Sequence, residues 1–423
     1  MTLQRIEAER LIPGSGQPVD DGVVILDGET ISYAGPASSA PGTPGADTVT
    51  ARAVMPGMWD AHGHFMGLRS ADFNVLPQES IPLRSARIVT DLRRALDAGF
   101  TSVRETGGLG INFVQAIEEG SVEGPAIYAA GTTLSTTGGH GDLHSLPHHW
   151  VVDFGHLGGE FRLCDGPAEC ARATREQLRR NAKLIKVCAS GGVLSEVDHP
   201  IHQQFTDAEL RAIVEVAGMA DRIVAAHCHG KPGIMAALEA GVKTIEHGTY
   251  LDEEAAVAMR EAGAILVTTR TIFLELLDHG HVLPEYALTK LRATVDRHGE
   301  AITIAKENGV TIAAGTDVAM SGTDLPDSWG RNGREVELLV ELGLTPLEAI
   351  EAITALGPAT LGPQGPKSGV LAEGYDADVI VLDEDPLADV SILAQPDHVT
   401  GVWKAGRRVK TLAPASDRVL SEA

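Results

Sequence analysis

The chain has 423 residues, 43% of them hydrophobic, which is enough for one large domain and a smaller one. Its formal net charge of −24 would repel phosphate backbones and anionic lipid surfaces, so nucleic acid and membranes are not expected partners. Four cysteines without a CxxC pair, no apolar leader and no run of about 18 apolar residues predict a reduced, cytoplasmic protein.

The first fifty residues predict short strands. Val23–Leu26 and Ile31–Ala34 are rich in β-formers and flank the turn-forming pair Asp27-Gly28. A stretch rich in Pro, Gly, Ser and Ala at Gly35–Ala46 predicts a surface loop. The β-rich segment Thr48–Met58 follows and contains the turn-forming Pro56-Gly57.

From about residue 57 to residue 360, short β-rich runs alternate with helix-length segments. The predicted strands are Met58–His62, Thr101–Glu105, Ala126–Ala130, Leu184–Cys188, Ile223–His227, Thr244–His247, Ile265–Thr269 and Ile312–Ala314. The predicted helices are Ser85–Ala98, Pro167–Asn181, Asp207–Asp221, Lys231–Ala240, Asp252–Glu261, Tyr286–Glu307 and Asn332–Leu342. Eight βα units predict a (β/α)₈ barrel. An open doubly wound sheet is the alternative, but it would not explain where the polar residues fall.

Strand character returns in the C-terminal tail, at Gly369–Leu371, Ala377–Leu382 and His398–Lys404. Neither end of the chain has enough apolar residues for a core of its own, so the two ends are expected to pair. We therefore predict a composite β-domain of residues 1–56 and 361–423, packed on a barrel domain of residues 57–360.

Polar residues occupy the predicted carboxyl ends of the barrel strands, the end that carries the functional site in this architecture. His62 and His64 are two residues apart on a strand, so both side chains point to the same side. A lone H-x-H pair is weak evidence, but His227, His247 and Asp317 follow at later strand ends. Imidazole and carboxylate groups suit zinc and related divalent ions, so this set predicts a metal site.

Lys186 lies at the fourth predicted strand end among apolar neighbours. A buried amine loses its proton more easily than an exposed one. The neutral amine can add CO₂ and form an anionic carbamate that bridges two metal ions. The alternative is a lysine that forms a salt bridge with a carboxylate in the pocket, and the residues alone leave both possibilities open.

Five longer motifs surround these residues and the C-terminal strands: Pro56-Gly57-Met58-Trp59-Asp60-Ala61-His62-Gly63-His64, Lys186-Val187-Cys188-Ala189-Ser190-Gly191-Gly192, Gly241-Val242-Lys243-Thr244-Ile245-Glu246-His247-Gly248, Gly315-Thr316-Asp317 and Gly374-Tyr375-Asp376-Ala377-Asp378-Val379-Ile380-Val381-Leu382. With these motifs the chain resembles the amidohydrolase superfamily over nearly its whole length. Within it, the resemblance is greatest to the binuclear branch with a carboxylated lysine, which includes prolidase-like carboxypeptidases, ochratoxin-hydrolysing amidases, and molinate- and phenylurea-type hydrolases.

The resemblance implies a distorted TIM barrel with a β-sandwich formed by both termini, and two divalent ions, zinc first among them. By position, His62, His64 and Asp317 would hold the more buried ion, and His227 and His247 the second. Lys186, carboxylated on its side-chain nitrogen, would bridge both ions. The resemblance also suggests a homo-oligomer, with an octamer as one candidate.

This resemblance leads to a mechanistic hypothesis for amide hydrolysis. Two metal ions would lower the pKa of a shared water, and Asp317 would act as general base and then as general acid. His229 and His140 are candidates to bind the substrate, although each could instead be a polar residue of the loop that carries it. Lys231 could neutralise an anionic substrate, or it could simply begin the next helix.

Three alternatives remain. A carbamate or urea hydrolase and a cyclic-imide hydrolase or deaminase could use the same scaffold, although many deaminases of the superfamily lack the lysine of strand four. A non-enzymatic scaffold protein would be expected to have lost ligands. A small-molecule amide is the expected substrate: an N-acyl amino acid, a dipeptide with a hydrophobic C-terminal residue, or an ochratoxin-like amide. Its selection is expected to lie in the loops His140–Leu163 and Thr271–Glu285.

Overall fold

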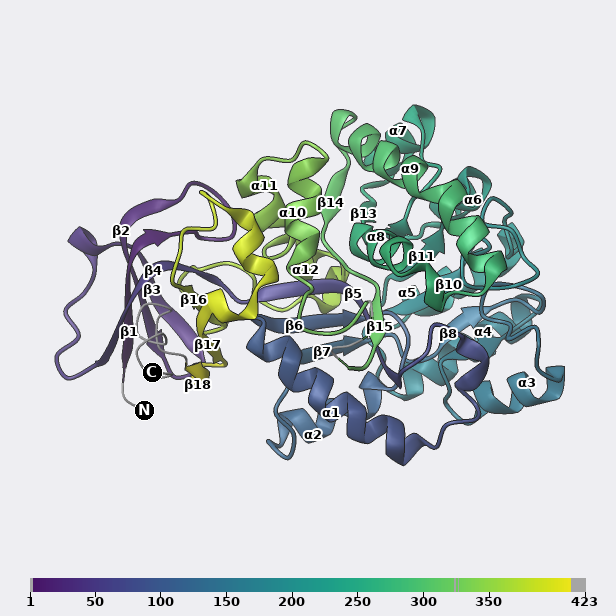
Figure 1. Ribbon diagram of the computed structural model, residues 1–423, viewed down its shortest axis with the longest axis horizontal. Helices are drawn as coiled ribbons and strands as arrows, with labels where there is room; N and C mark the ends of the chain where they lie inside the picture. The colour runs from purple at the N-terminus through teal and green to yellow at the C-terminus, as the bar shows by residue number, and fades with distance from the viewer. Residues whose placement is uncertain (1–2, 323–324, 326, 412–423) are drawn as a thin grey trace.

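The computed structural model describes residues 3–322, 325 and 327–411. A sheet domain that holds both ends of the described chain lies beside a larger barrel surrounded by helices (Figure 1). Residues 1–2 and 412–423 of the predicted composite β-domain lie outside the described residues.

The sheet domain combines strands from both ends of the chain in one seven-stranded sheet of order β18-β17-β16-β4-β1-β2-β3. Strand β4 joins the two ends, because it pairs in parallel with β1 and antiparallel with β16. The strands are β1 (Gln4–Leu11), β2 (Val19–Asp27), β3 (Thr30–Pro36), β4 (Asp47–Pro56), β16 (Val379–Leu382), β17 (Val399–Lys404) and β18 (Arg407–Thr411). Pairing between the two ends explains how short terminal segments, each poor in apolar residues, share a single apolar cluster.

The barrel strands run parallel in two ladders, which makes the barrel distorted. They are β5 (Met58–Leu68), β6 (Phe100–Glu105), β7 (Ala126–Ala129), β10 (Ile185–Cys188), β11 (Val224–Cys228), β12 (Thr244–His247), β13 (Ile265–Val267) and β14 (Thr311–Ala313), with the short β8 (Thr133–Ser135), β9 (Phe161–Leu163) and β15 (Val318–Met320). The N–H of Ala61 in β5 donates to the carbonyl of Ala314, just beyond β14, at 3.0 Å and links the two ladders. The predicted distorted TIM barrel with a terminal β-domain is confirmed.

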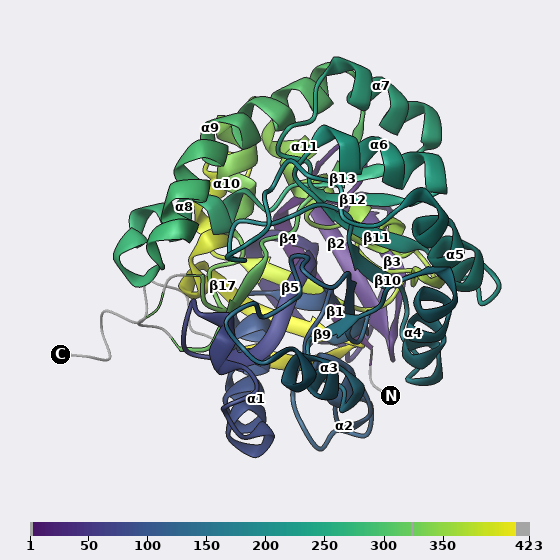
Figure 2. The same cartoon turned by 90° about the vertical axis from the view of Figure 1, so that its right-hand side faces the viewer.

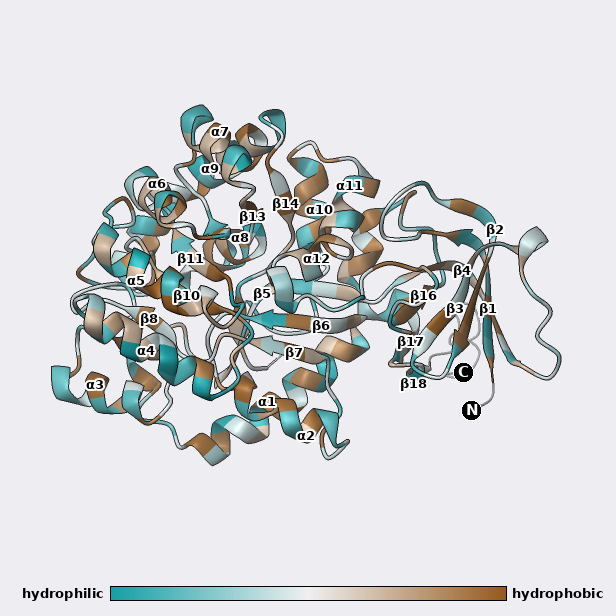
Figure 3. Ribbon diagram, turned by 180° about the vertical axis from the view of Figure 1, so that it is seen from behind, coloured by the Kyte–Doolittle hydropathy of each residue, from teal (hydrophilic) through white to brown (hydrophobic). Residues whose placement is uncertain are grey.

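Helices cover the outside of the barrel, and Figure 2 shows α4 to α7 and α9 in an arc around the strands. The helices are α1 (Ile81–Asp97), α2 (Val114–Glu118), α3 (His148–His156), α4 (Pro167–Arg179), α5 (Asp207–Gly218), α6 (Lys231–Ala240), α7 (Glu253–Ala262), α8 (Arg270–Asp278), α9 (Glu285–Glu307), α10 (Arg334–Glu341), α11 (Pro346–Ala352) and α12 (Leu356–Ala359). Polar and apolar residues alternate along these helices (Figure 3), because one face of each helix packs on the strands. Helix α5 begins at a capping box in which Thr206 and Glu209 satisfy each other's backbone N–H groups.

The segments predicted to select the substrate, His140–Leu163 and Thr271–Glu285, each contain helical residues that were not predicted, in α3 and α8. One strand prediction was wrong. Gly369–Leu371 forms no strand, and β1 and β18 were not predicted. Within residues 3–322, 325 and 327–411, no helix combines the length and apolar character needed to cross a bilayer.

Candidate active site

A cavity opens at the carboxyl ends of the barrel strands. It brings together eight of the nine residues predicted from the sequence for the site: His62, His64, His140, Lys186, His227, His229, His247 and Asp317. They come from strands β5, β10, β11 and β12 and from the loops that follow β8, β11 and β14. Residues far apart in the sequence therefore meet because parallel barrel strands end at one face.

One cluster consists of His62, His64 and Asp317, whose potential ligand atoms all lie within 4.8 Å of one another. Nε2 of His64 lies 2.9 Å from Oδ1 of Asp317, and Nε2 of His62 lies 3.4 Å from the same oxygen. Nδ1 of His64 lies 2.6 Å from the carbonyl oxygen of Gly107. A carbonyl only accepts, so Nδ1 carries the proton and Nε2 presents a lone pair to the cavity.

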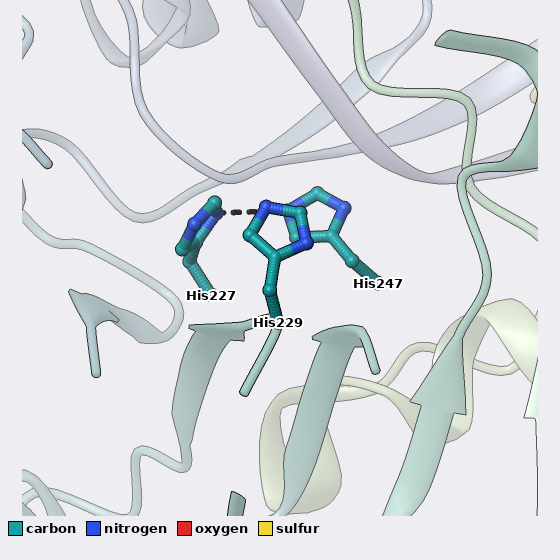
Figure 4. Close-up of side chains that lie close together, drawn as sticks. All are labelled: His227, His229 and His247. Carbon is teal, nitrogen blue, oxygen red and sulfur yellow. Dashed lines mark hydrogen bonds between the residues drawn. The ribbon is translucent and has the colours of Figure 1, made fainter. Parts of the chain in front are cut away.

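A second cluster consists of His227, His229 and His247, and Figure 4 shows the three rings converging. Nε2 of His247 lies 2.9 Å from Nδ1 of His227. The other nitrogen of His227, Nε2, lies 3.3 Å from the carbonyl oxygen of Gly191, so it donates and leaves Nδ1 as the nitrogen with a lone pair. Nδ1 of His229 instead bonds to the hydroxyl of Thr249 at 2.7 Å.

Lys186 lies between the two clusters. Its side chain is buried, and Nζ lies 3.3 Å from Nε2 of His62. Burial lowers the pKa of this amine, while the charges of Glu246 and Asp317 partly oppose the shift. Over the described part of the chain, Lys186 forms no ion pair with a carboxylate, unlike the salt-bridged lysine considered above as the alternative.

Burial also keeps the histidines neutral. It lowers the pKa of His229 to about 3 and of His140 to about 4, and it holds those of His227 and His247 well below the usual value. Neutral imidazole is the form that binds metals. Burial alone would raise the pKa of Asp317, but the charges and hydrogen bonds of His62 and His64 outweigh it and lower that pKa well below its usual range.

Buried side chains beneath the clusters fix their orientation. Oε2 of Glu246 lies 2.7 Å from Nδ1 of His62 and accepts a hydrogen bond from Nη2 of Arg104 at 2.6 Å. The carboxylate of Asp60 accepts from the backbone N–H groups of His62 and Thr316, at 3.0 and 3.1 Å. These bonds hold the end of β5 against the segment that carries Asp317 and aim Nε2 of His62 into the cavity.

The backbone is strained at the same place. His247, Thr269, Asp317 and Asp327 have φ values of 69°, 56°, 62° and 55°, in the left-handed region. Such conformations are uncommon for residues other than glycine, and they are rarest for β-branched residues such as threonine. The hydroxyl of Thr269 lies 2.7 Å from Nδ1 of His247, so the strained turn places a partner for that ring.

His140 and Lys231 differ in their placement. Nδ1 of His140 lies 2.8 Å from the hydroxyl of Ser195, and its ring stacks on that of His227 with 4.3 Å between centroids. Lys231 does not line the cavity. Its ammonium pairs with Asp252 at 2.7 Å and Glu254 at 2.6 Å on the outside of the barrel, so its charge is already compensated. Lys231 is therefore not retained as a substrate-binding residue.

The remaining lining of the cavity is mostly apolar. It comes from β5, from the loops after β5 and β10, from β9 and β15, and from α8 and α9. The apolar residues are Met66, Phe73, Phe161, Val193, Leu194, Ile272, Phe273, Leu276, Leu291, Ala319 and Met320. The arrangement suits a substrate with one polar reacting end and one bulky apolar end.

Some functional residues could not be identified from the sequence. Glu246 stands next to His247 in the glycine-bounded motif, which was the one available signal for it. Arg104 lies near the end of a predicted strand, and nothing along the chain indicates that it pairs with Glu246. Thr249, Thr269 and Asp327 carry no motif at all.

The donor set fits divalent metal ions. Buried neutral imidazoles and one ionised carboxylate converge with their unprotonated atoms toward a common space, and this is the ligand chemistry that zinc and similar ions prefer. Each cluster contributes at least two imidazoles, and the amine of Lys186 lies next to the imidazole of His62.

The sequence and fold match known proteins over nearly the whole chain. The family model described as "Amidohydrolase family" matches residues 53–409. The chain is 41% identical over 421 residues to ochratoxinase of Aspergillus niger, an alignment that covers 96% of this chain and 86% of ochratoxinase.

Solved structures of other proteins have a similar fold over nearly the whole chain. The crystal structure of A. niger ochratoxinase has a TM-score of 0.91 and 39% identity, with 97% of this chain and 96% of that chain covered. A prolidase crystallised with N-methylphosphonate-L-proline has a TM-score of 0.88 and 32% identity, with 97% and 100% covered.

Proposed function

The chain belongs to the amidohydrolase family and is a hydrolase of carbon–nitrogen bonds, and from this premise we propose that it cleaves amides with a bulky apolar group. One observation carries the proposal: the cavity combines two clusters of metal-binding type with an extended apolar wall. The substrate class would comprise N-acyl amino acids, dipeptides with a hydrophobic C-terminal residue, and ochratoxin-like amides.

Two divalent ions, with zinc first among them, are part of the proposal. His62, His64 and Asp317 would hold one ion, and His227 and His247 the other, with Lys186 as a carboxylated bridge. The lowered pKa of Lys186 supports the bridge, because only a neutral amine adds CO₂. When bound, the ions would lower the pKa of a water and polarise the scissile carbonyl.

Asp317 would move the proton in this mechanism. Its carboxylate is ionised, is partly exposed to the cavity and lies 2.9 Å from Nε2 of His64. An ionised carboxylate at this position can accept the proton of the attacking water and return it to the leaving nitrogen.

His229 and His140 are proposed to contact the substrate. Nδ1 of His229 bonds to Thr249, which leaves Nε2 of the ring available for the substrate. The ring of His140 covers His227 from the cavity side. Either imidazole could donate to the carbonyl oxygen or to a carboxylate of the substrate.

The test is a hydrolysis screen with metal content measured on the same preparation. The substrates would be N-acyl amino acids, Xaa-Pro and Xaa-hydrophobic dipeptides, ochratoxin-like amides, arylureas, thiocarbamates and cyclic imides. We expect turnover of apolar amides that depends on bound divalent metal. Turnover confined to ureas, thiocarbamates or cyclic imides would overturn the proposal, as would full activity in protein stripped of metal.

A further inference from the structure

The wall of the cavity contains a carboxyl group that the mechanism above does not use. Asp327 lines the cavity and is 3% exposed. Its Oδ2 accepts the backbone N–H of Ala319 at 3.1 Å, and its carbonyl oxygen accepts the N–H of Met320 at 3.1 Å. Its Oδ1 is buried and has no hydrogen-bond partner within residues 3–322, 325 and 327–411. A fixed, buried and unsatisfied oxygen at a cavity wall is costly unless a ligand completes it.

The charges around Asp327 indicate which kind of ligand its Oδ1 would bind. Burial and the charges of the acidic residues Asp317, Glu275 and Asp60 raise the pKa of its carboxyl well above the usual value, so this carboxyl needs a neighbouring positive charge to ionise near neutral pH. No cation forms an ion pair with Asp327 in the described part of the chain. A ligand with a positive charge would relieve both the repulsion and the missing hydrogen bond, and an ammonium group offers three donors with that charge.

The backbone of Asp327 is held in place for such a role. Its φ of 55° is in the left-handed region, which aspartate and asparagine tolerate better than other residues with a side chain. The two backbone hydrogen bonds to β15 fix the turn, so Oδ1 is already oriented before a ligand arrives.

We propose that Asp327 determines specificity by binding a protonated amino group of the substrate through Oδ1. The preferred amides would then carry a free ammonium group, in contrast to analogues in which that group is missing or acylated. This inference rests on the proposed amide hydrolysis and narrows its substrate class.

The experiment compares three substrates that differ in one group: L-alanyl-L-phenylalanine, its des-amino analogue N-propionyl-L-phenylalanine and its hydroxy analogue N-lactoyl-L-phenylalanine. Each is assayed as kcat/KM with the metal-loaded wild-type enzyme and with Asp327→Asn. Asparagine keeps the left-handed turn and an oxygen for the N–H of Ala319, but it lacks the charge. Asp389→Asn is the matched control, because Asp389 also accepts a backbone N–H, from Ser391 at 2.9 Å, but does not line the cavity.

We expect Asp327→Asn to lower kcat/KM for the dipeptide at least about tenfold, the range of a lost charge-assisted hydrogen bond, and to change the propionyl substrate less than about twofold. The ratio of the two effects cancels the different intrinsic reactivity of the two amides. An equal change for all three substrates, or none, would overturn the inference and leave the proposed function intact. An equal loss for the lactoyl and alanyl substrates would show that a neutral donor suffices and would overturn the ammonium assignment. If the wild-type enzyme hydrolysed no amide of the wider screen, the proposed function would fail and this inference with it.

Discussion

The carboxylate of Glu246 holds the imidazole of His62 beneath the cavity, with 2.7 Å between Oε2 and Nδ1. Arg104 donates to the same oxygen at 2.6 Å, and all three side chains are at most 1% exposed. The hydroxyl of Thr244 donates to the other oxygen at 2.5 Å, so every neighbour of this carboxylate is a donor. The charge of Glu246 therefore compensates Arg104 and selects the tautomer of His62 at once.

We predict that Glu246→Gln lowers the free energy of unfolding by about 3–5 kcal/mol, because it leaves the buried guanidinium of Arg104 uncompensated and places an amide donor against other donors. Chemical denaturation measures the loss. Glu254→Gln is the control, because Glu254 pairs with Lys231 at the surface and its loss should leave the stability nearly unchanged. Equal stability of the two variants would contradict a structural role for the buried pair.

Asp317→Asn should separate proton transfer from metal binding. The amide keeps the size of the carboxylate and one oxygen that could bind an ion, but it cannot take a proton from water. We expect kcat to fall by about 10²–10⁴-fold, the usual contribution of a general base. Metal content, measured by mass spectrometry of the same preparation, should stay near the wild-type value. Near-normal turnover in this variant would rule out Asp317 as the base, whatever its metal content.

The carbamate on Lys186 can be detected without an activity assay. The buried amine is held toward its neutral form, so it should take up CO₂ when metal binds. Protein stripped of metal and reloaded with zinc in ¹³C-bicarbonate should show a carbamate carbon in its NMR spectrum. Lys186→Gln should not show this signal, and Lys183→Gln, which changes a partly exposed lysine just before the same strand, should keep it. Absence of the signal from the reloaded wild-type protein would contradict the bridge.

The alternation of strands and helices could be predicted because it is written in local periodicity, and the convergence of His62, His64, His227, His247 and Asp317 follows from strand order in a barrel. Neither inference needs knowledge of side-chain contacts. The fold class was predicted correctly for this reason, and the family was predicted from its sequence motifs.

The missed parts depend on contacts between distant segments. Arg104 and Glu246 are 142 residues apart, and only the closed barrel places them within a hydrogen bond. Helix α8 was not predicted within the loop Thr271–Glu285. Its apolar residues line the cavity, and this contact cannot be inferred from the local sequence. Lys231 lies only two residues after His229. It begins helix α6, however, and its ammonium pairs with Asp252 and Glu254.

The stability of the metal-free protein should fall as the pH decreases below about 6.5. An imidazole of the unfolded chain takes up its proton near pH 6.5, whereas His229 in the folded protein stays neutral down to about pH 3. Between these values the unfolded state binds the additional proton, so lowering the pH favours unfolding.

Each such histidine should cost about 2 kcal/mol between pH 6.5 and pH 5, at 1.36 kcal/mol per unit. Urea denaturation of chelator-treated protein at pH 7, 6 and 5 tests this. His229→Asn should reduce the pH dependence by about one proton, and His279→Asn, which changes a partly exposed histidine away from the cavity, is the matched control. A pH dependence that His229→Asn does not alter would show that His229 titrates normally in the folded chain.

The packing of Gly192 against His140 allows the position of this imidazole to be changed without removing it. A methyl group at Gly192 would overlap with the ring of His140, and the backbone there has no positive φ that would exclude alanine. Gly192→Ala should therefore push the ring off His227. If His140 binds the substrate, Gly192→Ala and His140→Asn should both lower kcat/KM, by about 10–100-fold for the loss of one oriented donor, with metal content unchanged.

Gly218→Ala is the control for Gly192→Ala, because a methyl group at Gly218 meets no atom within 4 Å and should leave kcat/KM unchanged. The two test variants distinguish a functional from a structural role. Gly192→Ala keeps the imidazole and loses only its position, so equal losses in the two variants require that position for activity. A large loss in Gly192→Ala with normal kcat/KM in His140→Asn would show instead that the methyl group disturbs the neighbouring ligands and that His140 does not contact the substrate.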